Sequence, residues 1–166
     1  MVVDKILPNL YLTDWVSASR LKREPDMVFI AVAPPASGIE EQMHLERGMN
    51  PSYKPDYVFP AVDADEPLIA LSQKNLKYIE DAAKQIAKSL GEGKKVIVHC
   101  HQGVSRSPLA VIKYLMDSRG IDFDEAQEIV EKGEVGWEGG RGQLFLNPAI
   151  AKAFRRYKHP SKVRFT

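Results

Sequence analysis

The nine residues HCHQGVSRS, at positions 99–107, contain the only cysteine of this 166-residue chain, followed six positions later by an arginine. The apolar run KVIVHC leads into this segment, and a helical pattern of apolar residues follows it, so we expect it to join a buried strand to a helix. The first amides of a helix have no partner within it, and the helix dipole places positive charge there. The segment is therefore predicted to form an anion-binding loop.

The residue types in this loop indicate a particular chemistry. Gly103 suits a tight turn in which the backbone approaches a ligand, and the planar fork of Arg106 can hold two oxygens of a phosphate. Cys100 lies at the base of the loop, where the field that attracts an oxyanion also stabilises a thiolate. A phosphate held there presents its phosphorus to the sulfur, which predicts phosphoryl transfer through a phosphocysteine.

Such a reaction also needs a group that manages protons. One carboxyl group can protonate the leaving alcohol and later deprotonate the attacking water. The stretch AVDADEP (61–67) follows an expected strand and offers Asp63, Asp65 and Glu66. Loops at the carboxyl ends of parallel strands gather beside a ligand site. Each of the three side chains could instead cap the following helix, so the sequence alone leaves the choice open.

The pattern of apolar residues predicts the elements that must position these groups. We expect strands within 5–14 on either side of a turn at Pro8-Asn9, then at 26–33, 57–62 and 95–100. We expect helices at 15–23, 39–47, 76–90, 106–119, 122–133 and 147–157, the last two capped by Asp122 and Asn147. Residues 34–56 are expected to form an elaborated surface connection, and 136–142 a loop. The alternation predicts an α/β fold, with a central, mostly parallel sheet flanked by helices.

Composition limits the classes of function. Hydrophobic residues make up 44% and charged residues 27%, with a net charge of +1. We therefore expect one domain over residues 1–160 with a basic tail at 161–166, and no electrostatically driven binding of nucleic acid. A lone cysteine gives no internal disulfide, and no long apolar run is present. These features predict a cytoplasmic or nuclear protein that does not associate with membranes.

The two histidines beside the cysteine do not complete a metal site in the sequence. His99 and His101 are expected to flank Cys100 on a strand and its end, where neighbouring side chains point to opposite faces. His44 and His159 are far away in the sequence and isolated. No second cluster supplies four ligands, so we expect neither a metal nor another cofactor.

The stretch HCHQGVSRS resembles the Cys-x5-Arg signature of the cysteine-based protein tyrosine phosphatases. The rest of the chain resembles the dual-specificity phosphatase domain of that superfamily. ILPNLYLTD is similar to its opening strand pair, VIVHCHQGVSRSPLAVIKYLM to its strand, loop and helix, and FDEAQEIVEKG to the next helix. Residues 34–56 and 134–146 match poorly.

The resemblance implies a role for each residue of the signature. Cys100 would be the nucleophile, Ser107 would donate a hydrogen bond to its sulfur, and His99 would orient the loop from behind. The phosphate would be bound by the loop residues His101, Gln102, Gly103, Val104, Ser105 and Arg106. The resemblance favours Asp63 as the general acid and leaves Asp65 as the alternative.

The implied activity is hydrolysis of phosphomonoesters on proteins, at phosphotyrosine and at phosphoserine or phosphothreonine, so the expected partner is a phosphorylated protein. Relatives act on inositol lipids, sugars or glucans and RNA 5′-phosphates, and these remain alternatives. The variable loop positions carry no permanent positive charge of the kind a polyanionic substrate would favour. A module that binds phosphoproteins without catalysis is a further alternative, although such a protein would usually have lost Cys100, Arg106 or the acid.

Overall fold

The computed structural model describes residues 3–133 and 140–156, and its core is a five-stranded sheet. The strands are β1 (Val3–Leu7), β2 (Leu10–Thr13), β3 (Met27–Ala31), β4 (Tyr57–Val58) and β5 (Lys95–His99). They are ordered β1-β2-β5-β3-β4, and β1 alone runs antiparallel to its neighbour. The expected α/β class and mostly parallel sheet are confirmed, as is the turn at Pro8-Asn9, where Asn9 takes a φ of 66°.

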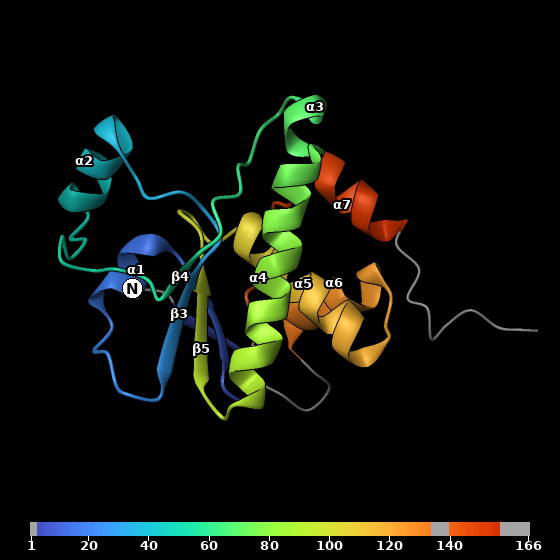
Figure 1. Ribbon diagram of the computed structural model, residues 1–166, viewed down its shortest axis with the longest axis horizontal. Coiled ribbons are helices and arrows are strands. Elements are labelled where there is room, and N and C mark those ends of the chain that lie inside the picture. The colour runs from blue at the N-terminus through green and yellow to red at the C-terminus, as the bar shows by residue number, and fades with distance from the viewer. Residues whose placement is uncertain (1–2, 134–139, 157–166) are drawn as a thin grey trace, which may run out of the picture.

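Helices cover both faces of the sheet (Figure 1). They are α1 (Trp15–Arg20), α2 (Gly38–Glu46), α3 (Pro67–Ala70), α4 (Gln73–Gly91), α5 (Arg106–Arg119), α6 (Phe123–Lys132) and α7 (Pro148–Arg155). Helices α4, α5 and α6 pack side by side against one face, whereas α1 and α2 lie on the other side. The predicted caps are present, because Asp122 accepts a hydrogen bond from Glu125 N and Asn147 from Ala149 N and Ile150 N.

The central strand β5 shows how the sequence divides its side chains between the two faces. Val96 and Val98 belong to the main core with α4 and α5, whereas Ile97 packs on the opposite face with Ala18 and Phe29. Successive side chains on a strand point to opposite faces, so an uninterrupted apolar run is what a strand covered on both faces requires.

The functional loops meet at one edge of the sheet because the strands end there together. Thr13 of β2 and Ala31 of β3 are both in register with His99, the last residue of β5. Each of these parallel strands runs in the same direction, so the segments that follow them emerge side by side.

Between residues 57 and 70 one expectation is wrong and one element was not foreseen. The strand predicted at 57–62 consists only of Tyr57 and Val58, both exposed at the sheet edge. Pro60 has no N–H to donate to a neighbouring strand, which explains why pairing stops. The helical turn α3 was not predicted, whereas the long helix expected from the apolar residues at 76–90 is present as α4.

Other expectations concern parts of the chain outside the described residues. These are most of the loop 136–142, His159, the last residue of the helix predicted at 147–157, and the tail 161–166. Among the helices that the structure describes, none combines the length and the apolar character that crossing a membrane requires.

Candidate active site

The signature segment connects β5 to α5 through a tight loop of residues 100–105. Gly103 has a φ of 75°, in the left-handed region that favours glycine. A Cβ atom added there would lie 2.7 Å from the Thr13 carbonyl oxygen, so the loop packs directly on the end of β2. The loop therefore needs a glycine at this position both for its backbone conformation and for its packing.

The sulfur of Cys100 lies at the base of this loop. The Gly103 amide donates to Sγ at 3.2 Å, and the Ser107 hydroxyl donates to it at 3.3 Å. On its other side Cys100 packs with a small cluster of buried side chains, Trp15, Ala31 and Ala33. The sulfur thus accepts from two hydrogen-bond donors and comes just before the N-terminus of α5, where the helix dipole favours negative charge.

Arg106 is the first residue of α5 and is only partly buried. Its Nη1 donates to the Ala61 carbonyl at 3.0 Å, which ties the helix start to the segment before Asp63. Its Nε is buried and has no partner among the described residues. A buried N–H without an acceptor is costly, and an anion held at the loop could supply that acceptor.

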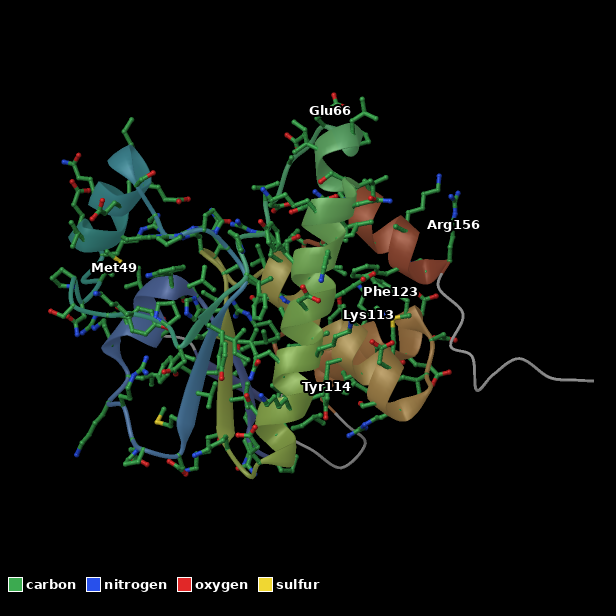
Figure 2. All side chains as sticks on the ribbon, viewed as in Figure 1. Met49, Glu66, Lys113, Tyr114, Phe123 and Arg156 are labelled. Carbon is green, nitrogen blue, oxygen red and sulfur yellow. The ribbon has the colours of Figure 1, made fainter. Side chains whose placement is uncertain are left out.

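The three candidate acids lie in different surroundings. Asp63 is exposed and accepts a hydrogen bond at 2.9 Å from Nδ2 of Asn147. Asp65 is exposed and makes no hydrogen bond with any described residue. Glu66 caps α3 by accepting from Leu68 N, and it lies at the far tip of that helix, pointing away from the molecule (Figure 2). Asp63 alone is bonded to a residue that also contacts the phosphate loop.

His99 supports the loop from within the core. It is fully buried, and Nδ1 donates to the Cys100 carbonyl at 3.2 Å. Its other ring nitrogen, Nε2, then accepts from the hydroxyl of Tyr53 at 2.6 Å. Burial lowers the pKa of His99 to about 4, so this ring is neutral at pH 7 and contributes no charge to the site. Tyr53 was not singled out from the sequence.

His101 connects the loop to the segment 34–56. Because a carbonyl only accepts, its Nε2 donates to Pro34 O at 2.7 Å, and its Nδ1 then accepts from Nε2 of His44 at 3.0 Å. Its ring stacks on Trp15. Burial is the main cause that lowers the pKa of both histidines, so both are neutral at pH 7. The view of His44 as an isolated histidine is wrong, because α2 brings it to the loop.

Glu40, His44 and His101 form the one group among the described residues with donor atoms close enough for a metal ion, all within 4.8 Å of one another. Both nitrogens of His101 are already hydrogen-bonded, one of them to His44 itself. Burial is the largest cause that lowers the pKa of the two histidines, and the Glu40 carboxylate opposes it. The contacts of this group fit a brace for the loop better than a metal site.

Two further residues that contact the loop were missed as functional candidates. Arg141 donates from Nε to Gly103 O at 3.2 Å and from Nη1 to Asp4 at 2.9 Å, so it ties the loop to β1. Asn147 was predicted only as a helix cap, yet its backbone N–H also donates to Ser105 Oγ at 2.9 Å. Neither contact has a local sequence signal, because each joins segments about 40 residues apart.

A pocket of about 280 Å³ opens beside the loop on the side of α1 and α2. Gln102 and His101 form its wall on the loop side, and Arg20 and Arg47 line it from the two helices. The loop therefore contacts residues 61–66, the acid segment, through Arg106, and borders this partly basic pocket through His101 and Gln102.

Comparison with known proteins identifies the family. The family profile for the catalytic domain of dual specificity phosphatases matches residues 40–157. Dual specificity protein phosphatase 1B of Arabidopsis thaliana is 26% identical over 124 residues, which cover 74% of this chain and 68% of that protein. Tyrosine-protein phosphatase yvh1 of Schizosaccharomyces pombe is 31% identical over 130 residues, which cover 75% of this chain and 34% of that protein.

Solved structures share the fold. The human tyrosine phosphatase-like serine/threonine/tyrosine-interacting protein superposes with a TM-score of 0.63 at 22% identity, over 93% of this chain and 94% of that one. Human DUSP28 superposes with a TM-score of 0.62 at 15% identity, over 94% and 92% of the two chains. The family profile spans well over half of the sequence, so the chain belongs to the dual specificity phosphatase catalytic-domain family, within the protein tyrosine phosphatase superfamily, and is a phosphoric monoester hydrolase.

Proposed function

We propose that this enzyme hydrolyses phosphotyrosine and phosphoserine or phosphothreonine in proteins through a phosphocysteine intermediate. The single observation that carries the proposal is the placement of the Cys100 sulfur. It accepts hydrogen bonds from Gly103 N and the Ser107 hydroxyl, at the N-terminus of a helix whose first side chain is Arg106. Loop amides and a guanidinium are the groups that stabilise charge developing on a transferring phosphoryl group.

In the first step the Cys100 thiolate attacks phosphorus as the bond to the leaving oxygen breaks. The backbone of residues 101–106 and the Arg106 side chain hold the three remaining phosphate oxygens. Asp63 gives its proton to the leaving oxygen, so the product alcohol departs neutral. A positioned acid of this kind contributes about 10²- to 10⁴-fold to the rate.

In the second step the Asp63 carboxylate takes a proton from a water molecule whose oxygen attacks the phosphocysteine. The sulfur–phosphorus bond breaks and orthophosphate leaves. The electron pair returns to Cys100, where the Ser107 hydroxyl stabilises the departing thiolate. His99 takes no part in proton transfer, and its contact with the Cys100 carbonyl orients the loop.

A protein substrate is supported by the charge of the loop and by the relatives. His101 is buried and neutral at pH 7, so it adds no positive charge for a polyanionic ligand. The Arabidopsis and yeast relatives carry the names of a dual specificity protein phosphatase and a tyrosine-protein phosphatase. The chain spans about two thirds of the first relative and about a third of the second.

The test compares wild type with Cys100→Ser, reduced and free of metal, on p-nitrophenyl phosphate and a substrate panel. The panel holds phosphotyrosine, phosphoserine and phosphothreonine peptides, inositol phosphates, sugar phosphates and RNA 5′-phosphates. We expect wild type to prefer phosphopeptides, and the variant to bind them without turnover because its anion-binding loop remains. Turnover by Cys100→Ser near the wild-type rate would exclude the phosphocysteine route. Preference for inositol, sugar or RNA phosphates would overturn the substrate class, and an inactive wild type that still binds phosphopeptides would indicate a binding module.

A further inference from the structure

Asn147 joins the two loops on which the proposed reaction depends. Its side-chain Nδ2 donates to Asp63 Oδ1 at 2.9 Å and to the Ala64 carbonyl at 2.8 Å. Its backbone N–H donates to Ser105 Oγ, in the phosphate loop, at 2.9 Å. One buried side chain thus contacts the candidate acid and, through its own backbone, the loop that holds the nucleophile.

These contacts are separate from the role of Asn147 as a helix cap. The cap uses Oδ1, which accepts from Ala149 N and Ile150 N at 3.2 Å. A cap needs only an acceptor, which serine or aspartate would supply equally well. The two hydrogens on Nδ2 are not needed for the cap, and both are directed at the acid segment. Asparagine is the residue that combines a cap acceptor with two donors in so short a side chain.

The acid segment is anchored at its start by other residues. Arg106 donates to Ala61 O, and Asn75 exchanges two hydrogen bonds with the backbone of Val62. Beyond Val62, the hydrogen bonds of Asp63 and Ala64 with the described residues outside their own segment are those made by Asn147. Asp63 itself is exposed, so packing does little to fix its carboxyl group.

We propose that Asn147 is the positioning residue that selects Asp63 as the general acid and fixes it relative to Cys100. This inference rests on the proposed function, in which Asp63 is the acid. Because Asn147 donates to Oδ1, that oxygen is held as an acceptor, and the transferable proton is directed to Oδ2. The hydrogen bond from the Asn147 backbone N–H to Ser105 Oγ fixes this carboxyl group relative to the phosphate loop.

The test uses variants that separate the cap from the donors. Asn147→Ser keeps a cap acceptor and the backbone N–H but loses both amide N–H groups that bond the acid segment, whereas Asn147→Ala also loses the cap. Asp122→Ser, at the matching cap of α6, is the control. Each is assayed by kcat/KM on p-nitrophenyl phosphate, whose leaving group needs little protonation, and on an alkyl phosphate, whose leaving group needs it strongly.

We expect Asn147→Ser to lose at least about tenfold more activity on the alkyl ester than on p-nitrophenyl phosphate, a fraction of the full effect of a general acid. Asp122→Ser should leave the ratio of the two rates at its wild-type value. If the role of Asn147 were purely structural, activity on both substrates would fall by the same factor. The loss would then be larger in Asn147→Ala, which lacks the cap, than in Asn147→Ser. An unchanged ratio in a folded Asn147→Ser would overturn the inference.

A double-mutant cycle with Asp63→Asn separates this inference from the proposed function. If Asn147 acts through Asp63, adding Asn147→Ser to Asp63→Asn should change the ratio less than about twofold, because coupled residues are not additive. Full additivity would overturn the inference while leaving Asp63 as the acid. The ratio is kcat/KM on p-nitrophenyl phosphate divided by kcat/KM on the alkyl phosphate. If Asp63→Asn alone leaves this ratio unchanged and Asp65→Asn raises it, the assignment of Asp63 as the acid fails.

Discussion

At the scale of single residues, the sulfur of Cys100 accepts hydrogen bonds from two donors, the Gly103 N–H and the Ser107 hydroxyl. Ser107 is fully buried, so its hydroxyl cannot turn to solvent, and it lies 3.3 Å from Sγ. Hydrogen bonds to charged groups contribute about 1.5–3 kcal/mol. The loss of this one should be felt most when sulfur leaves phosphorus, since the thiolate regains its full charge in that step.

Ser107→Ala should therefore lower kcat about 10- to 100-fold, the kinetic equivalent of that hydrogen bond. Because breakdown of the intermediate is slowed more than its formation, phosphocysteine should accumulate. Stopped-flow measurement with p-nitrophenyl phosphate should show a burst of p-nitrophenol close to one equivalent of enzyme. A Ser107→Ala enzyme with wild-type kcat and no burst would mean that this hydroxyl has no part in the second step.

Gly103 offers a second residue-scale prediction, with a matched control elsewhere in the chain. Gly103 and Gly93 have nearly the same φ, 75° and 76°, but only at Gly103 would a Cβ meet backbone, at 2.7 Å from Thr13 O. Alanine at either site pays the cost of the left-handed conformation, about 1–3 kcal/mol. Gly103→Ala should lower stability further and reduce activity severely, measured by urea unfolding and kcat, whereas Gly93→Ala should remain fully active. Equal effects of the two substitutions would show that the contact with Thr13 does not constrain the loop.

At the scale of elements, the phosphate loop is held by segments that are far from it in the sequence. Residues 34–56 approach it through His44 and Tyr53, and the segment before α7 approaches it through Arg141. Arg141 also pairs with Asp4 at 2.9 Å, and both side chains are largely buried, so this ion pair joins β1 to the loop. Side chains from these distant segments therefore brace the loop.

Removal of the Arg141 guanidinium should loosen the loop without touching the sulfur. Arg141→Met keeps much of the apolar stem but leaves Gly103 O and the Asp4 carboxylate without their donor. We expect about tenfold weaker binding of orthovanadate, since losing one hydrogen bond to a charged group costs about 1.5 kcal/mol or more. The measurement is the inhibition constant for vanadate, with Arg155→Met at the exposed ion pair with Asp124 as control. Equal vanadate affinity in the two variants would contradict the role given to Arg141.

The contrast between local and distant contacts explains what the sequence could predict. The strand, loop and helix around Cys100 form one continuous segment, so apolar patterning and helix-start chemistry located them within a residue or two. His44 and Arg141 have no such signal, because only the folded chain brings them to the loop. The strand expected at 57–62 was overestimated because Pro60 interrupts pairing that the apolar pattern alone would extend.

At the scale of the whole molecule, three buried histidines surround the active loop and stay neutral in the folded protein. Burial is the main cause that lowers the pKa of His44, His99 and His101 from the ordinary value of 6.5. At pH 7 these histidines therefore add no positive charge beside the sulfur. The consequence for stability is a free energy of unfolding that depends on pH.

His99 makes the largest contribution that can be given a range of pH. Its pKa is about 4 in the folded protein and near 6.5 in the unfolded chain, so between these values the unfolded chain binds more protons. The contribution of His99 to the free energy of unfolding is therefore fully present above pH 6.5. It is lost as the pH falls toward 4 and amounts to about 3 kcal/mol. His44 and His101 change it in the same direction.

Urea unfolding of Cys100→Ser at a series of pH values from 7 to 4.5 measures this decline without interference from thiol oxidation. In His99→Asn the starting stability should be lower, because the contact with Tyr53 is lost, but the decline with pH should be shallower by the share that His99 supplied. Carboxylates titrate in both proteins, so their contribution cancels in the comparison of slopes. Parallel curves for the two proteins would mean that His99 has nearly the same pKa in the folded and the unfolded protein. Burial of its ring would then not lower the pKa, which would contradict the account given for His99.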